Sequence, residues 1–179
     1  MLLDQHIPDY HFSEYHRISI SAPVERIYEA IEGLDVSSSI ITRVLYALRR
    51  MPANAVTLEG MENVGFRILG TQQNEELVFG VIGRFWRVPP EIVNFKSSEF
   101  KGFATKGYAK AAANFLIEGN GHAGAIVSTE TRILCTSPGS RFRFLIYWLF
   151  IRPFSGIIRK EMLRIIKREA EGKMAVHGT

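Results

Sequence analysis

The sequence predicts an α+β protein in which a curved antiparallel sheet wraps around one long C-terminal helix. The first observation is the order of patterns along the 179 residues: one strand, two short helices, a series of strands and a final helix. The second is that the central strand-like runs are separated only by turn residues, as in an antiparallel meander. The third is a last element of about thirty residues, about 45 Å long if wholly helical.

The first strand and the two short helices are predicted from local patterns. Residues 15–21 (YHRISIS) carry β-branched side chains at alternate positions, which indicates a strand. Pro23 suits the first turn of a helix, since its missing N–H would be unpaired there, and apolar residues then recur at helical spacing as far as Gly33. A second helix is predicted from about Val36 to Arg50, capped by Asp35.

The central part of the chain is predicted to be a meander. Its strand-like runs cover residues 64–71, 76–88, 91–100, 107–119 and 125–136. Alanine favours helix, but the Gly, Tyr, Phe and Ile around the alanine-rich run 109–113 fit a strand. The segment GNGHAG, residues 119–124, has the glycine spacing of a dinucleotide-binding loop. A strand follows it instead of a helix, so it is predicted to be a hairpin turn.

Composition bounds the class of protein. No linker or repeat is visible, which predicts one domain over residues 1–179 with flexible ends at 1–10 and 172–179. The single cysteine, Cys135, and the absence of a secretory pattern at the N-terminus predict a reducing, cytoplasmic location. The stretch from Arg141 to Arg168 carries a net charge of +7, and the rest of the chain carries −3, which gives the total of +4. Its aromatic residues do not alternate with the basic ones, so nucleic acid is not an expected partner.

The apolar run FLIYWLFI, residues 144–151, is predicted to be part of a core helix. It has eight residues between Arg143 and Arg152, whereas a membrane span needs about twenty. It is apolar nearly all round, so we expect protein to cover it on several sides, as a concave sheet would. Pro153 predicts a bend.

Two stretches resemble a known superfamily. ISISAPVERIYEAI, residues 18–31, resembles the opening of the START-related, polyketide-cyclase and pollen-allergen-like superfamily, often called SRPBCC. The stretch STETRILCTSPGSRFRFLIYWLFIRPFSGIIRKEMLRIIK, residues 128–167, is similar to the end of an uncharacterised bacterial branch of it. The resemblance implies a helix-grip fold, which the element order also predicts, with an internal cavity for apolar small molecules or lipids.

A ligand site is predicted between the sheet and the long helix. On the strands around the hairpin, period-two alternation places small or apolar side chains on one face and Lys110, Asn114, Glu130 and Arg132 on the other. The expected ligand-binding residues are Ala109, Ala111, Ala113, Phe115, Thr129 and Thr131 of the sheet, with Tyr147 and Phe150 of the helix. The sequence leaves two locations open for Glu130 and Arg132. Either they form part of a ladder of charged residues on the solvent-exposed outer face of the sheet, or they lie in the interior as a buried pair for proton transfer.

Three functions fit this picture. The leading one is binding of a hydrophobic small molecule or lipid, without catalysis and without a cofactor. The alternative is a polyketide-cyclase or dehydratase type of enzyme that uses Glu130, Arg132 or a histidine as acid or base. The third is a lipid carrier that docks peripherally on anionic membrane through its basic helix, with weak, salt-sensitive binding. No metal site is predicted, because His6, His11 and His16 are five residues apart and no Cys/His cluster accompanies them. Oligomeric state, ligand and pathway are left open.

Overall fold

The computed structural model describes residues 1–35, 65–119 and 124–172. Its six-stranded sheet is antiparallel throughout, with the order β1-β6-β5-β3-β2 and with β4 paired to β3. The strands are β1 (Phe12–Ile20), β2 (Arg67–Gln72), β3 (Glu76–Arg84), β4 (Glu91–Val93), β5 (Ala109–Gly119) and β6 (Ala125–Cys135).

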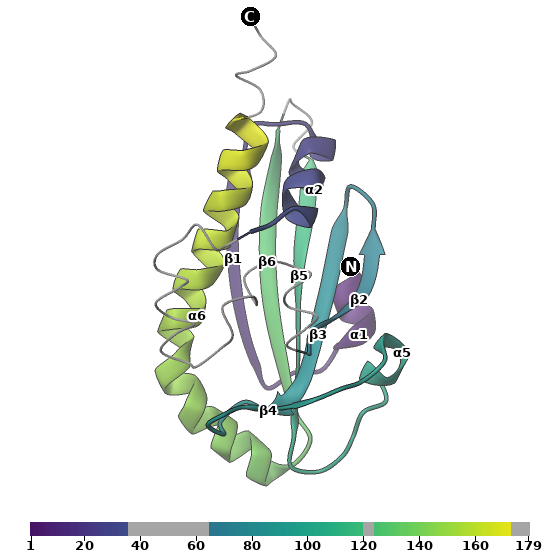
Figure 1. Cartoon of the computed structure of the whole chain (residues 1–179), viewed down its shortest axis with the longest axis vertical. Helices are drawn as coiled ribbons and strands as arrows, with labels where there is room; N and C mark the ends of the chain where they lie inside the picture. Colours follow the sequence, from purple (N-terminus) through teal and green to yellow (C-terminus); the bar gives the residue numbers. More distant parts are fainter. Residues whose placement is uncertain (36–64, 120–123, 173–179) are drawn as a thin grey trace, which may run out of the picture.

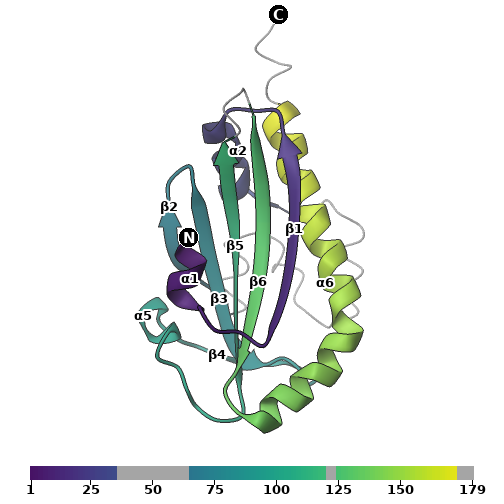
Figure 2. The same cartoon turned by 180° about the vertical axis from the view of Figure 1, so that it is seen from behind.

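Helices cover both faces of this sheet (Figures 1 and 2). The long helix α6 (Pro138–Gly172) and the short helix α2 (Val24–Glu32) lie on one face, and α6 runs along the edge strand β1 and its neighbour β6. Helices α1 (Leu2–His6) and α5 (Ser97–Phe100) lie on the other face. The curved antiparallel sheet with its long C-terminal helix confirms the predicted α+β helix-grip fold. The predicted second helix, Val36–Arg50, lies outside the described residues.

The β5–β6 hairpin has the register that alternation predicts. Ala113 lies opposite Thr131, Ala111 opposite Ile133, and Gly119 opposite Ala125 at the end next to the turn. The odd-numbered side chains of both strands therefore share one face. They pack with α2 and α6, so this face is the interior between sheet and helix.

The opposite face is buried as well, by residues of the N-terminal segment that was predicted to be a flexible end. Leu3 and Ile7 are 0% and 1% exposed, and they pack with Phe100 against even-numbered side chains of β3 and β5. A side chain at Gly80 would collide with the Phe100 ring, because the added Cβ would lie 2.9 Å from it. Both faces of β3 are thus covered, and its residues from Glu76 to Gly83 are all buried.

Two of the predicted strands are too long. The run 76–88 stays in the sheet only as far as Arg84, and Phe85 and Trp86 follow it in a turn. Both rings therefore reach Phe144 of α6, whereas a continuous strand would have sent them to opposite faces. The run 91–100 ends as a strand at Val93, and Ser97–Phe100 form α5.

Helix α6 differs from the prediction in how it is covered. It continues through Pro153 and is bowed along its length (Figure 1). In the apolar run, only Phe144 and Trp148 are buried, and Leu149 and Phe150 are 68% and 70% exposed. The expectation that protein covers this run on several sides is wrong, because the helix lies over one edge of the sheet. Within the described ranges, no helix is long and apolar enough to cross a membrane.

Candidate functional site

Four polar side chains lie together on the interior face of the sheet. Glu14 and His16 come from β1, and Thr129 and Thr131 come from β6. The register pairs Glu14 with Thr131 and His16 with Thr129, so the four occupy adjacent positions on one face. We call these four residues the polar patch.

Three oxygen atoms of the polar patch are buried without a hydrogen-bond partner. His16 Nε2 and Glu14 Oε1 are 3.0 Å apart, which uses one carboxylate oxygen. The other oxygen, Glu14 Oε2, and the hydroxyls of Thr129 and Thr131 have no partner in the part of the chain that the structure describes. An unsatisfied buried polar group costs about 1–3 kcal/mol, and more if it is charged. Such atoms in a folded protein call for a water molecule or a ligand.

Helix α6 passes directly over this patch at Gly156. A Cβ at that position would lie 2.6 Å from Glu14 Oε1 and 3.4 Å from His16 Nε2. Only glycine permits so close an approach between the helix and the two side chains. The backbone of α6 therefore covers the part of the polar patch that lies on β1.

The patch separates two apolar clusters. One contains Ile18 and Ile20 of β1, Val127 of β6, α2 and the C-terminal half of α6. The other contains Phe12 of β1 and Ile133 of β6, with an aromatic group around Phe144. The ring centroid of Phe144 lies 5.0 Å from that of Phe12 and 5.7 Å from that of Trp148. The interior thus has polar side chains in its middle and apolar ones at each end.

A row of paired residues extends the patch across the sheet. Thr131 lies opposite Ala113 of β5, and Ala113 lies opposite Phe79 of β3. The guanidinium carbon of Arg159, from α6, lies 5.6 Å from the centre of the Phe79 ring. Carboxylate, hydroxyl and guanidinium groups therefore face the same interior.

Ala111 differs in exposure from its neighbours on the interior face. It lies on the central strand β5 and faces α6, yet it is only partly buried, whereas Ala109 and Ala113 are 0% and 2% exposed. Its methyl group is therefore accessible from the interior face of the sheet.

Most of the predicted ligand-binding residues do face this interior. Ala109, Ala113, Phe115, Thr129 and Thr131 are buried there, and Tyr147 is half-buried beside Phe144. Phe150 is the exception. With 70% of its surface exposed it points away from the sheet, so its prediction as an interior residue is wrong.

Glu130 and Arg132 lie on the opposite face of the sheet. Arg132 donates hydrogen bonds to Glu130 Oε1 at 2.7 Å, to Asp4 Oδ1 at 2.7 Å and to the carbonyl of Ile7 at 3.3 Å. Burial alone would lower the pKa of Arg132, but the hydrogen bonds and charges of Glu130 and Asp4 outweigh it and raise that pKa. This geometry excludes the two residues from the interior. The alternative of a solvent-exposed face is also wrong for Arg132, because α1 covers this residue and leaves it only 7% exposed.

The other charged residues of this face also hold helices in place. Glu76 accepts hydrogen bonds from the first backbone N–H groups of α1, at Leu2 and Leu3, and from Asn114 Nδ2 at 2.7 Å. Lys110 Nζ donates to the carbonyls of Phe100 and Lys101 at the end of α5. Burial lowers the pKa of Lys110. These buried charges serve the packing of α1 and α5 on the sheet.

Sequence reasoning missed Glu14 and His16, although the signal was present. In FSEYHRISI the residues at positions 12, 14, 16, 18 and 20 share one face of the strand. Ile18 and Ile20 point to the core, so Glu14 and His16 must point to the same side. Spacing between histidines tests only for a metal site, whereas the face of its own strand is what places His16 inside, next to Glu14.

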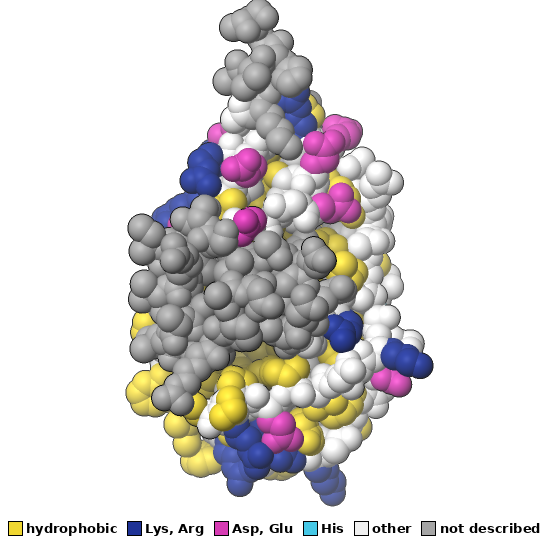
Figure 3. All heavy atoms as spheres, in the orientation of Figure 1, with side chains coloured by type: hydrophobic (Ala, Val, Ile, Leu, Met, Phe, Trp, Pro, Cys, Tyr) yellow, Lys and Arg dark blue, Asp and Glu magenta, His cyan; other side chains and the backbone are white. Residues whose placement is uncertain are grey.

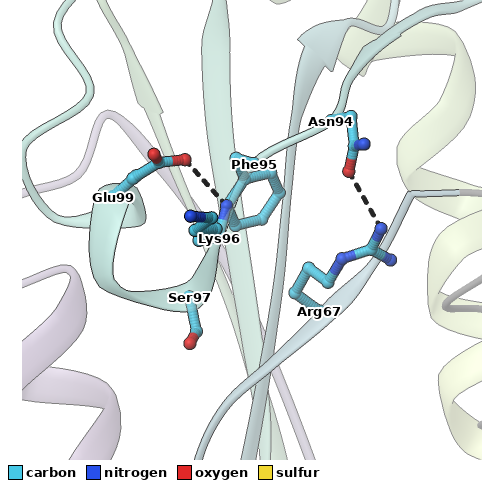
Figure 4. A pocket seen from close by; sticks show the side chains of 6 residues that line it. All are labelled: Arg67, Asn94, Phe95, Lys96, Ser97 and Glu99. Carbon is cyan, nitrogen blue, oxygen red and sulfur yellow. Dashed lines mark hydrogen bonds between the residues drawn. The ribbon is translucent and has the colours of Figure 1, made fainter.

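A separate pocket of about 550 Å³ lies at the other side of the sheet, beside β2, β4 and α5 (Figure 4). Its polar groups are engaged with one another: Arg67 Nη2 donates to Asn94 Oδ1 at 2.9 Å, and the Lys96 N–H donates to Glu99 Oε2 at 2.8 Å. This pocket is open to solvent, and residues that line it form hydrogen bonds with one another. It does not have the buried polar atoms without a partner that distinguish the polar patch.

Two further chemistries, metal binding and attack by a cysteine thiolate, do not fit the described residues. In the described ranges, no group of three His, Cys, Asp or Glu side chains comes together as a metal site. Burial raises the pKa of the Cys135 thiol to about 12, which leaves it protonated near neutral pH and unsuited to nucleophilic attack.

Comparison with known proteins gives fold likeness at low identity. No family model and no curated protein matches the chain. Among solved structures, DR_A0006 from Deinococcus radiodurans is 10% identical, with a TM-score of 0.42 over 90% of this chain and 99% of that one. CalU16 from Micromonospora echinospora is 17% identical, with a TM-score of 0.33 over 91% and 86%. The Zhui aromatase/cyclase from Streptomyces sp. R1128 is 12% identical, with a TM-score of 0.38 over 94% and 99%. At this distance none of these proteins assigns a ligand or a reaction to the chain, and the fold rests on the arrangement of sheet and helix described above.

Proposed function

We propose that this protein binds a small, largely apolar molecule with at least one polar group in the interior between the sheet and α6. The apolar part of the ligand lies over Ala111 and against the aromatic group around Phe144. Its polar group bonds to the polar patch. A lipid or another hydrophobic small molecule with a hydroxyl, carbonyl or carboxyl group meets these requirements.

The observation that carries the proposal is the set of three buried oxygens in the polar patch, on Glu14, Thr129 and Thr131. Binding sites for small molecules combine apolar walls with a few polar groups that orient the ligand. The patch has this composition, since apolar clusters flank it on both sides. A domain that needed only stability would gain by placing valine at positions 129 and 131.

Native mass spectrometry of freshly purified protein tests the proposal directly. We expect an adduct to co-purify with the wild type and to be depleted in a Thr129→Val/Thr131→Val variant, because valine keeps the shape and removes the hydroxyls. Binding of an apolar fluorescent probe, measured in parallel, should be displaced by the extracted adduct.

Thr136→Val is the matched control. Thr136 lies just beyond β6, and its hydroxyl is already bonded to the carbonyls of Thr105 and Tyr108 and to the Tyr108 N–H. That variant should retain the adduct. Equal adduct in wild type and double variant, or none in any sample together with no probe binding, would contradict the proposal.

A second candidate function is catalysis in the same interior, and the Glu14–His16 hydrogen bond favours it. A carboxylate that holds a histidine ring in one orientation is a common arrangement for general acid–base chemistry. His16 thus takes up the predicted histidine alternative, in place of Glu130 and Arg132, as the acid–base candidate of a cyclase or dehydratase. Cyclisation with loss of water would need a group that moves protons between ligand atoms, and His16 is the candidate for this role.

His16→Gln and Glu14→Gln variants separate catalysis from binding. If the protein catalyses a dehydration, two co-purifying compounds should differ by the mass of one water, and their ratio should shift toward the heavier one in His16→Gln. A binder without catalysis would carry the same compounds in the same ratio in both variants and in the wild type.

A further inference from the structure

An apolar stripe runs along the outward side of the first half of α6. We use this name for five residues at helical spacing, with exposures between 42% and 70%: Phe142, Ile146, Leu149, Phe150 and Ile157. They lie on the opposite side of the helix from Phe144 and Trp148, which pack on the sheet. Clustered large apolar side chains in water mark a surface that meets another apolar phase.

Basic residues flank the stripe and have no acidic partner among the residues that the structure describes. Arg143 and Arg152 lie on its two sides, and Arg141 precedes it. None of the three forms an ion pair with any described residue. The helix has no acidic residue from Pro138 to Lys160. Figure 3 shows apolar side chains beside Lys and Arg side chains at the lower end of the molecule, where α6 begins.

The same side of the helix changes character beyond Ile157. Its outward positions are then Lys160, Arg164, Lys167 and Arg168, of which the last three form ion pairs with glutamates of the same helix. One face of α6 therefore presents apolar side chains flanked by arginines that have no ion pair with a described residue, and beyond them basic residues that are mostly paired with glutamate. An interfacial helix on an anionic bilayer needs these two properties, because apolar side chains enter the acyl boundary and cations stay with the headgroups.

The charges disfavour a second copy of the chain as the occupant. An antiparallel self-contact centred on Leu149 and Phe150 would place the arginines of both copies in one apolar interface. The stripe offers no acidic residue to neutralise them. Anionic lipid headgroups supply the missing negative charge.

We propose that the apolar stripe of α6 docks on the surface of an anionic lipid bilayer, with its aromatic and aliphatic side chains inserted at the headgroup boundary. The helix lies along the surface and does not cross it. This differs from the expected weak, salt-sensitive contact through the basic helix, because apolar side chains also enter the bilayer. It is independent of whether the interior binds a ligand, because no stripe residue belongs to the polar patch.

Sedimentation with sucrose-loaded vesicles tests the docking on the full chain. The vesicles are made of phosphatidylcholine alone, or of phosphatidylcholine and phosphatidylglycerol in equal parts. We expect partition onto the anionic vesicles that weakens with salt but does not vanish. Leu149→Ser/Phe150→Ser should reduce the partition coefficient about tenfold or more. Arg143→Gln and Arg152→Gln should each reduce it about fivefold at low salt.

Tyr15→Ser and Arg17→Gln are the matched controls, because these exposed residues lie on β1 on the face away from α6. Both should leave partition unchanged, and thermal melting should verify that every variant is folded. Absence of wild-type partition at low salt would overturn the proposal, as would equal partition of the serine double variant. A wild-type dimer in analytical ultracentrifugation that Phe150→Glu dissociates would assign the stripe to a second copy instead.

Discussion

Thr131 illustrates at the scale of one residue how a binding site costs stability. Its buried hydroxyl has no partner among the described residues, so removing it relieves a desolvation penalty. We expect Thr131→Val to raise the unfolding free energy of the ligand-free protein by about 1 kcal/mol, measured by urea denaturation. Stabilisation combined with weaker ligand binding is the signature of a functional residue.

The comparison is with Thr136→Val, which deletes a hydroxyl that is satisfied in the fold. That substitution should lower the unfolding free energy by about 1–3 kcal/mol. A loss of similar size at Thr131 would show that its hydroxyl has a partner in the folded protein and would weaken the case for the polar patch.

Single residues also show where sequence reasoning stops. Alternation along β6 was sufficient to place Thr129 and Thr131 inside, because the two faces of that hairpin differ in composition. The burial of Arg132 was not predictable, because the cover comes from Asp4 and Ile7, more than a hundred residues away along the chain. A charged strand face looks solvated until the segment that covers it is known.

At the scale of the elements, the alanines of β5 separate open space from close packing. Ala113 is 2% exposed in the cluster with Phe79 and Phe115, whereas Ala111 is only partly buried. Ala113→Leu should overpack and cost about 1–3 kcal/mol. Ala111→Leu should leave the melting temperature unchanged or raised and should displace an apolar fluorescent probe. If Ala111→Leu destabilises the protein as much as Ala113→Leu, there is no space above β5 for a ligand.

Helix α1 is an element whose importance follows from its contacts and not from its length. Leu3 is fully buried beneath the sheet, so Leu3→Ala should reduce the unfolding free energy by about 2–5 kcal/mol. The exposed neighbour provides the control, since Gln5→Ala should stay within about 0.5 kcal/mol of the wild type. Equal behaviour of both variants in urea titrations would mean that the N-terminal end is loose, as its sequence suggested.

The elements also show why a single pattern can give both a right and a wrong prediction. The length of α6 was predictable, because apolar residues keep helical spacing on both sides of Pro153, which bends a helix without having to end it. Its environment was not, because an all-apolar run is compatible with cover on every side or on one side only. The position of the helix over one edge of the sheet decides between these cases, and only the packing of the whole chain determines that position.

For the whole molecule, histidine titration should make stability fall in mild acid. Burial lowers the pKa of His6 and of His11 from 6.5, with further lowering by Lys101 for His6 and by Arg141 for His11. His11 Nδ1 also accepts a hydrogen bond from the Cys135 N–H at 3.0 Å, which requires that nitrogen to be unprotonated. The unfolded chain therefore binds more protons than the folded one below pH 6.5, and stability present above that pH is lost as the pH falls through the folded pKa values.

We expect the melting temperature to drop from about pH 7.5 to about pH 5.5, the range in which histidine titrates. His11→Gln keeps a hydrogen-bond acceptor for Cys135 but removes the titration, so its melting temperature should depend less on pH over this interval. An unchanged pH dependence in this variant would assign the effect to other groups.

The polar patch also has a consequence for how the domain opens. It interrupts the apolar contacts along α6, so the two halves of this helix are anchored to different clusters, one through Phe144 and Trp148 and the other through Met162 and Ile166. Units that share few contacts can unfold separately, each with its own free energy. Amide hydrogen exchange should then be faster around Phe144 than around Ile166. A transient release of the first half of α6 would admit a ligand to the interior while the rest of the domain remains folded.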